Sequence, residues 1–218
     1  MTVGAVVLTQ GRRPDELRAA LDSLLAQRGV AVAAVVVGNG WVPEGLPDGP
    51  GTPPRDWVPR LRVGDRARPS DVTAVWEGCV AIPRAVFEQV GGWPAEFRFA
   101  HEGIDLAWRV LDTGRRVHYA GDLEVRHAPY VPAPHDERVY YAARNRVWLA
   151  RRHLPLPLGI LYVTSFALRT VPLVRTPARA RAALRGYRDG LRGPCGVRRP
   201  LRARTLWQMS RLGRPPVL

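Results

Sequence analysis

Two short apolar runs flank one amphipathic segment at the start of the chain. The first run covers residues 3–8 and the second starts at Val30. The segment between them follows Pro14 and Asp15, which are typical of a helix start, and precedes Gly29, which is typical of a stop. Its apolar residues recur at the spacing of one helix face, at Leu17, Ala20, Leu21, Leu24 and Leu25. The pattern predicts a strand–helix–strand unit with parallel strands, the beginning of an α/β fold.

The segments that follow the two predicted strands are candidate binding loops. Ligands of parallel sheets bind beyond the carboxyl ends of the strands. Here residues 9–13 and 38–41 occupy those positions, and both segments contain Gly and small polar side chains that let a ligand approach the backbone. The candidate contacts are Thr9, Gln10, Gly11 and Asn39. Plain turns are the alternative interpretation.

A third amphipathic pattern, at residues 101–114, predicts a helix with charges along one ridge. Its apolar face consists of Ile104, Ala107, Trp108 and Leu111, and Gly114 is the expected stop. Glu102, Asp105 and Arg109 fall on a separate ridge. Glu102 lies in the first turn, where the helix dipole favours an ionised carboxylate, and it follows an aromatic-rich turn that contains Trp93. A base that deprotonates an acceptor is one interpretation; a solvated face with an intrahelical ion pair is the other.

The pattern from Asp136 onward is mostly helical, with one apolar segment at residues 154–174. That segment is apolar for only fifteen residues before Arg169, which is less than the roughly 20 residues that cross a bilayer. We therefore expect a helix in the membrane interface, next to arginines that meet anionic lipid. Those arginines are Arg151, Arg152, Arg175, Arg179 and Arg181. A hydrophobic hairpin that packs on the rest of the protein is the alternative.

Charge and composition narrow the function classes. The 218 residues carry a net charge of +14, but residues 138–218 alone carry +17 and the first 137 residues carry −3. A nucleic-acid binder is the least favoured class, because no recognised motif accompanies the charge and aromatic side chains are not interleaved as stacking platforms. Cys79 and Cys195 lack paired spacing, and the first residues lack the pattern of a signal peptide, so we expect a cytoplasmic protein.

Two blocks of the sequence resemble the family 2 glycosyltransferases, in particular the actinobacterial type with a basic C-terminal extension. The first block comprises residues 3–27 and 35–40, with Thr9 at a strand end. The second, residues 78–127, contains a Gly-Gly-aromatic turn that ends at Trp93, an acidic position at Glu102, a Leu-x-x-Arg helix and a strand that ends in His127. Several spaced features in one order make the second block the more specific.

The resemblance implies a fold, a reaction and a set of roles. Family members have a GT-A fold and transfer a sugar, with inversion, from a nucleotide-sugar donor to a glycan or lipid-linked acceptor. Gly103 stands where many members carry the second acid of a pair, so Glu102 or Asp105 would be the base. By position, Thr9, Gln10, Gly11 and Asn39 would contact the donor, Trp93 and Arg109 would lie on the acceptor side, and His127 would help to hold a divalent cation, Mn²⁺ or Mg²⁺.

The segment around residues 43–57 departs from the family pattern. Eight of its first twelve residues are Pro or Gly, and the chain contains no D-x-D or D-D motif. The resemblance would place a metal-binding strand end there, so we expect a truncated GT-A domain over residues 1–135 and a helical, membrane-associating extension over residues 136–218. The chain would act peripherally at the inner face of the cell membrane. A catalytically inactive family remnant that binds the membrane surface is the alternative.

Overall fold

The computed structural model describes residues 2–9, 14–26, 31–38, 69–75, 80–120, 135–213 and 215–216. The chain divides into two compact units. Unit 1 comprises residues 1–57, 76–93 and 123–131, and unit 2 comprises residues 58–75, 94–122 and 132–218. The predicted junction at residues 43–57 lies outside the described residues.

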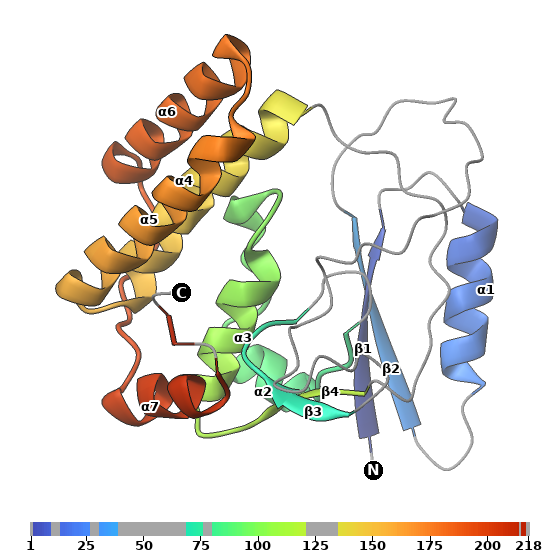
Figure 1. The fold of residues 1–218 in the computed structure, drawn as a ribbon. Helices are drawn as coiled ribbons and strands as arrows, with labels where there is room; N and C mark the ends of the chain where they lie inside the picture. The colour runs from blue at the N-terminus through green and yellow to red at the C-terminus, as the bar shows by residue number, and fades with distance from the viewer. Residues whose placement is uncertain are drawn as a thin grey trace. The chain divides into compact units, whose positions relative to one another are not determined.

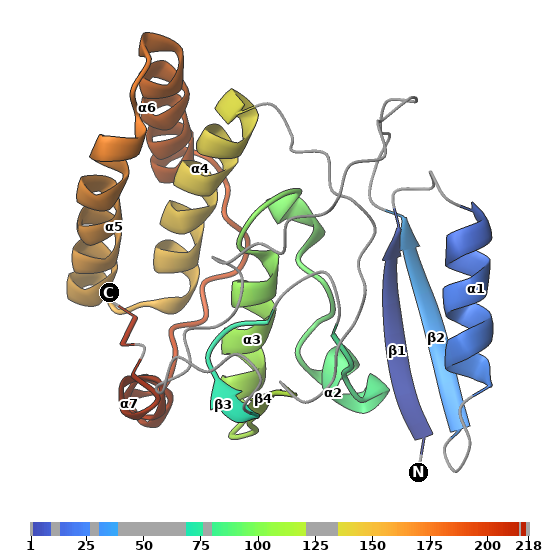
Figure 2. The same ribbon diagram turned by 45° about the vertical axis from the view of Figure 1, so that its right-hand side comes forward.

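Unit 1 contains the strand–helix–strand element expected from the apolar pattern. Strand β1 (Thr2–Thr9) and strand β2 (Ala31–Gly38) pair in parallel, and helix α1 (Pro14–Leu25) connects them (Figure 1). The register pairs Thr9 with Gly38, so the two carboxyl ends lie side by side. Figure 2 shows α1 alongside β2. One expectation for α1 was wrong: Leu25, assigned to the apolar face, is 60% exposed, because it lies in the last turn where the helix ends.

Helix α2 (Arg84–Gln89) also belongs to unit 1 and ends at the Gly-Gly-aromatic turn. Gly91 and Gly92 adopt φ angles of 85° and 75°, in the left-handed region that glycine enters without steric cost. The amide of Gly92 donates to the carbonyl of Phe87 at 2.8 Å, which satisfies one of the free carbonyls at the helix end. The two glycines therefore terminate α2 just before Trp93.

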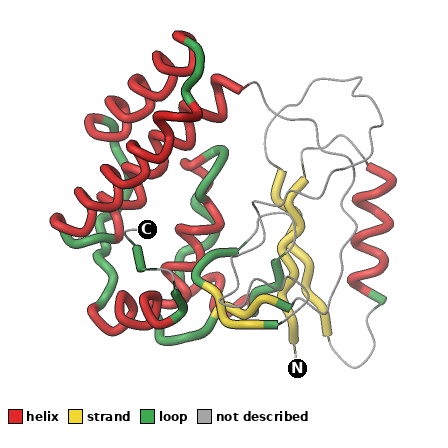
Figure 3. The backbone as a smooth tube through the Cα atoms, in the orientation of Figure 1, coloured by secondary structure: helices red, strands yellow, loops and turns green. Residues whose placement is uncertain are grey.

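Unit 2 is largely helical, as the tube in Figure 3 shows. A small antiparallel pair joins β3 (Ser70–Val72) to β4 (Val117–Tyr119), and the short 3-10 helix η1 (Ala95–Phe97) precedes helix α3 (Glu102–Asp112). Its other helices are α4 (His135–His153), α5 (Leu156–Thr170), the 3-10 turn η2 (Val171–Leu173), α6 (Pro177–Arg192) and α7 (Ala203–Arg211). The helices expected at residues 101–114 and after Asp136 are thus confirmed.

Helices α4 and α6 pack closely because α6 carries two glycines at the contact. A side chain added at Gly190 would lie 2.8 Å from Cβ of Val147 and 2.9 Å from the carbonyl of Arg144, and Gly186 faces Ala143 in the same way. Such distances leave no room for a methyl group. The buried residues of α4 include Asn145, Val147 and Leu149, whereas Val139 and Ala142, which share the apolar spacing of this helix, are half-buried.

Helix α5 packs on α4 (Figures 1 and 2) and carries exposed apolar side chains. The exposed apolar residues, which we call the α5 outer face, are Leu156, Ile160, Leu161 and Leu168. The packing of α5 on α4 matches the alternative prediction, a hydrophobic hairpin that packs on the rest of the protein. The exposed α5 outer face matches the prediction of a helix in the membrane interface. No helix within the described ranges is both long enough and apolar enough to cross a membrane.

Candidate functional site

The turn before α3 has an unusual backbone. Arg98, Ala100 and His101 have φ angles of 61°, 65° and 73°. Residues with a Cβ atom rarely adopt positive φ, and each such conformation costs free energy of order 1–3 kcal/mol that the surroundings must supply. This strained turn, residues 98–101, ends at Glu102, the first residue of α3. It thus fixes where the helix starts and where the Glu102 carboxylate lies.

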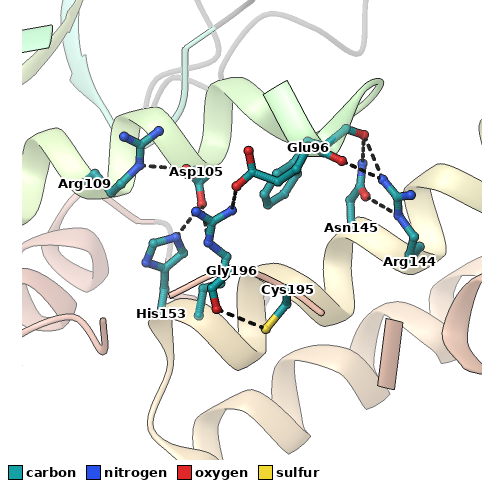
Figure 4. Close-up of polar contacts among 10 residues, drawn as sticks. Glu96, Asp105, Arg109, Arg144, Asn145, His153, Cys195 and Gly196 are labelled. Atoms are coloured by element: carbon teal, nitrogen blue, oxygen red, sulfur yellow. Dashed lines mark hydrogen bonds and ion pairs between the residues drawn. The ribbon is translucent and has the colours of Figure 1, made fainter. Parts of the chain in front are cut away.

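Asn145 of α4 holds this turn from the other side. Its side chain is fully buried (Figure 4 shows it beside Arg144). Nδ2 lies 2.9, 2.6 and 2.7 Å from the carbonyl oxygens of Phe97, Phe99 and Ala100. An amide group has two N–H donors, so the three carbonyls share them. The contacts satisfy backbone acceptors in a turn whose φ angles rule out regular helical pairing. We call this group the Asn145 clamp.

Arg144 completes the clamp. Its Nε donates to Oδ1 of Asn145 at 2.9 Å, which fixes the orientation of the amide. Its Nη2 donates to the carbonyls of Glu96 and Phe97 at 3.2 and 3.0 Å. The guanidinium lies 4.0 Å from the ring centroid of Trp148, a cation–π distance. The planar fork of an arginine suits this combination of stacking and multiple donation.

Asp105 lies one turn after Glu102 and is fully buried. Its Oδ2 accepts from Nε of Arg109 at 2.7 Å, and its Oδ1 lies 2.6 Å from Nε2 of His153 and 3.4 Å from Nε of Arg152 (Figure 4). Burial by itself raises the pKa of Asp105. The hydrogen bond from His153 and the charges of His153, Arg109 and Arg152 outweigh it and hold the pKa below its usual value. Asp105 is therefore an ionised carboxylate enclosed by donors.

Arg152 extends this network to η1. Its Nη1 donates to Oε1 of Glu96 at 2.7 Å, and Arg152 itself is buried. Neighbouring Arg151 donates from Nη1 to the carbonyls of Gly190 and Gly193 at 2.6 and 2.7 Å. The expectation that Arg151 and Arg152 meet lipid is wrong, because both bind protein groups that lie far away in the sequence.

Glu102 is 8% exposed, so the charged ridge of α3 is not a solvated face. The solvated-face alternative was wrong for Glu102 and Asp105, although its intrahelical ion pair exists between Asp105 and Arg109. Three side chains, those of Arg109, Arg152 and His153, pair with Asp105, whereas Glu102 occupies the amino end of α3. There the partial positive charge of the helix end favours the ionised form of the carboxylate.

His101, which precedes Glu102, is neutral. Burial lowers its pKa well below the usual value and the charge of Arg146 lowers it further, while a hydrogen bond to the backbone of Ala142 opposes them. Its Nε2 lies 3.2 Å from Nη2 of Arg146 and accepts from it, because a guanidinium can only donate.

The other predicted site residues fall in unit 1 or outside the described residues. Thr9 ends β1, opposite Gly38, and Trp93 is half-buried in unit 1. Gln10, Gly11, Asn39 and His127 lie outside the described residues. Within the described ranges, no three His, Cys, Asp or Glu side chains lie together as metal ligands. These residues therefore offer no set that fits the expected divalent cation, and we derive no step through one.

Sequence reasoning missed Arg144, Asn145 and His153. All three lie on α4, which we treated only as a basic, apolar-spaced helix. The signal was available: Asn145 and His153 fall among apolar residues on the side of α4 that became buried, and a polar residue there needs a hydrogen-bond partner.

Comparison with known proteins adds a distant relationship. Over 139 residues the chain is 30% identical to the N-acetylglucosaminyl-diphospho-decaprenol L-rhamnosyltransferase of Mycobacterium tuberculosis strain CDC 1551 / Oshkosh, and equally to the protein of that name from strain ATCC 25618 / H37Rv. These similar proteins are glycosyltransferases. The aligned region covers 60% of this chain and 45% of each relative, so the chain spans less than half the length of the curated relatives it matches. No protein-family profile and no solved structure matches the chain.

Proposed function

We propose that the protein is a glycosyltransferase of the family 2 type, which transfers a sugar with inversion from a nucleotide-sugar donor to a lipid-linked or cell-envelope acceptor. The observation that carries the proposal is the placement of Glu102 at the start of α3, behind a strained turn that the Asn145 clamp fixes. Strained backbone that neighbouring residues hold in place is concentrated at functional sites. The rhamnosyltransferase similarity supports the reaction class.

Glu102 would act as the base. Its carboxylate takes the proton of an acceptor hydroxyl while the hydroxyl oxygen attacks the anomeric carbon of the donor sugar. The bond from that carbon to the nucleoside diphosphate breaks, the diphosphate leaves with the electron pair, and attack from the opposite face inverts the configuration. General base catalysis of this kind contributes about 10²- to 10⁴-fold to the rate.

Asp105 would act as a positioning residue in this reaction. Its two oxygens are engaged by His153, Arg109 and Arg152 and the side chain is fully buried, so a hydroxyl could reach it only by displacing protein groups. Instead, it ties α3 to the end of α4. This favours Glu102 over Asp105 as the base.

Donor binding would occur at the edge of the parallel strands. The paired ends of β1 and β2 support a ligand site there, since open parallel sheets bind ligands beyond their carboxyl ends. Thr9, Gln10, Gly11 and Asn39 would contact the nucleotide. Arg109 and Trp93 would belong to the acceptor side, and His127 would serve any cation.

Turnover of the Glu102→Gln variant tests the proposal. With UDP-, GDP- and L-rhamnosyl-nucleotide donors, each with and without Mn²⁺, we expect the variant to lose about 10²- to 10⁴-fold in kcat at nearly unchanged donor binding. Glu88→Gln is the matched control, because Glu88 is an exposed glutamate whose ion pair among the described residues is with Arg84 on its own helix. Turnover by Glu102→Gln at the wild-type rate would show that Glu102 is not the base.

A catalytically inactive protein that binds the membrane surface is the second candidate. The α5 outer face favours it, since Leu156, Ile160, Leu161 and Leu168 are exposed on one helix. Wild-type protein that binds anionic vesicles but neither binds nor cleaves any nucleotide sugar would support this candidate against the enzyme. Peripheral association with the inner face of the cell membrane is common to both.

A further inference from the structure

Arg146 of α4 is an arginine for which the described residues supply no carboxylate. Two other arginines of α4 have polar partners for their guanidiniums. Arg152 pairs with Glu96 and Asp105, and Arg144 donates hydrogen bonds to backbone carbonyls. Across the described parts of the chain, no Asp or Glu side chain lies within ion-pair distance of Arg146. A guanidinium that is partly buried without a carboxylate costs free energy unless another negative group compensates its charge.

The contacts of Arg146 are aromatic or neutral. Its guanidinium lies 3.3 Å from the ring centroid of Phe166 on α5, and Nη2 meets the neutral ring of His101. Its Nη1 is buried and has no hydrogen-bond partner among the described residues. A second guanidinium, that of Arg169, lies 5.5 Å from the same Phe166 ring. The guanidiniums of Arg146 and Arg169 thus both lie near the Phe166 ring, and Nη1 of Arg146 has no hydrogen-bond partner among the described residues.

The charge on this arginine persists at neutral pH. Burial lowers the pKa of Arg146; Tyr162 and Tyr187 oppose this shift and the charge of Arg169 adds to it, but an arginine side chain does not lose its proton in proteins. The neutral state of His101 leaves its Nε2 as an acceptor, which orients the guanidinium. The group is therefore a fixed cation, half-buried as a whole, and its contact His101 immediately precedes the proposed base Glu102.

We propose that Arg146 and Arg169 bind a diphosphate group of the acceptor. This inference rests on the proposed function, because a lipid-linked sugar carries its diphosphate next to the sugar that reacts. Arginine matches phosphate oxygens through its planar fork of donors, and a diphosphate would supply the negative charge that the described protein groups lack. The same helix, α5, bears Arg169 and the apolar outer face, which suits a ligand with a charged head and a hydrocarbon tail.

Binding by full-length protein tests this inference without any turnover. Phosphatidylcholine vesicles that contain decaprenyl diphosphate are compared with vesicles that contain an equal charge of phosphatidylglycerol, and inorganic pyrophosphate is titrated as the soluble probe. The variant is Arg146→Met, which keeps an unbranched chain over Phe166 but removes the charge. Arg188→Gln is the control, since it removes one exposed arginine of α6. Thermal unfolding of each protein confirms that it is folded.

We expect Arg146→Met to weaken binding of the decaprenyl diphosphate vesicles by about 10- to 100-fold, the loss typical of hydrogen bonds to a charged group, while Arg188→Gln binds like wild type. If Arg146→Met weakens binding of pyrophosphate but not of the lipid vesicles, the site takes a soluble diphosphate. If it weakens binding of the lipid vesicles but not of pyrophosphate, the diphosphate comes from the lipid. Equal binding of both probes by wild type and a folded Arg146→Met would overturn the inference. Glu102→Gln protein should bind normally, so failure of the base assignment and failure of this site are distinguishable.

Discussion

Nε2 of His153 lies 2.6 Å from Oδ1 of Asp105, and both side chains are almost completely buried. The two residues are 48 positions apart, at the end of α4 and in the first turns of α3. With Arg109 and Arg152 on the same carboxylate, they form a cluster in which three basic side chains surround Asp105, while Arg152 also pairs with Glu96. The basic C-terminal region is therefore part of the structure that holds α3.

Removing the charge of Asp105 should destabilise unit 2. In Asp105→Asn, Arg109 loses its carboxylate and buried Arg152 keeps only Glu96, and breaking a buried ion pair in this way costs about 3–5 kcal/mol. Chemical denaturation followed by circular dichroism measures the loss. Glu88→Gln is the control and should leave the unfolding midpoint unchanged, because Glu88 and Arg84 are exposed. Wild-type stability of Asp105→Asn would show that the cluster does not support the fold.

The stability that the cluster around Asp105 provides should depend on pH. The folded-state pKa of Asp105 lies below its ordinary value, so the ionised form contributes stability that is fully present above about pH 4, the unfolded pKa. That contribution is lost as the pH falls from about 4 through the folded pKa. The unfolding free energy of wild type should thus decline below pH 4 more steeply than that of Asp105→Asn, in denaturant titrations at successive pH values. Parallel declines would contradict this assignment.

The Asn145 clamp should matter more to catalysis than to binding of the donor. Asn145→Leu leaves the carbonyls of Phe97, Phe99 and Ala100 without their buried donor, at a cost of about 1–3 kcal/mol of stability. Because the strained turn then relaxes, Glu102 moves from its place and kcat should fall at least tenfold, with little change in the KM for the donor. Steady-state kinetics on folded variant measures both. A variant with lower stability but unchanged kcat would make the clamp purely structural.

Local patterns sufficed for the helices and the first strands, but not for the polar contacts. The apolar spacing of α1 and α3 and the glycine at position 114 are properties of nearby residues, so they could be recognised without the fold. Asn145 and His153 bind groups 48 positions earlier; their place among apolar residues of α4 indicates that they need partners, but no local pattern identifies those partners. The same limit explains the error with Arg151 and Arg152, because a run of arginines has the same sequence whether it meets lipid or buried acceptors.

The close packing of α6 against α4 predicts opposite changes in stability for two glycine-to-alanine substitutions. In Gly190→Ala, the new methyl group would lie 2.8 Å from Cβ of Val147, closer than atoms pack, so the helices must separate. Overpacking of this kind costs about 1–3 kcal/mol. Gly159→Ala on α5 is the control: its methyl group would meet Ala150 at an ordinary 3.6 Å, and the higher helix propensity of alanine should stabilise the protein by up to about 1 kcal/mol. Thermal unfolding should move in opposite directions for the two variants; a shift in the same direction would contradict the close packing.

The α5 outer face should govern attachment to membranes. Ile160 and Leu168 are 60% and 66% exposed, and burial of such a side chain in the lipid interface yields about 1.5–3 kcal/mol when complete. The double variant Ile160→Ser, Leu168→Ser should therefore bind vesicles of phosphatidylcholine and phosphatidylglycerol at least tenfold more weakly in flotation assays.

Leu191→Ser is the matched control for this pair, because Leu191 is 63% exposed but lies on α6. Its binding should equal that of wild type. Binding should also weaken as salt rises, since the arginines of residues 138–218 supply the electrostatic part of the attraction, and the apolar variant should retain that salt dependence. If all three proteins bind alike, only charge holds the protein to the membrane, and the outer face must serve another purpose.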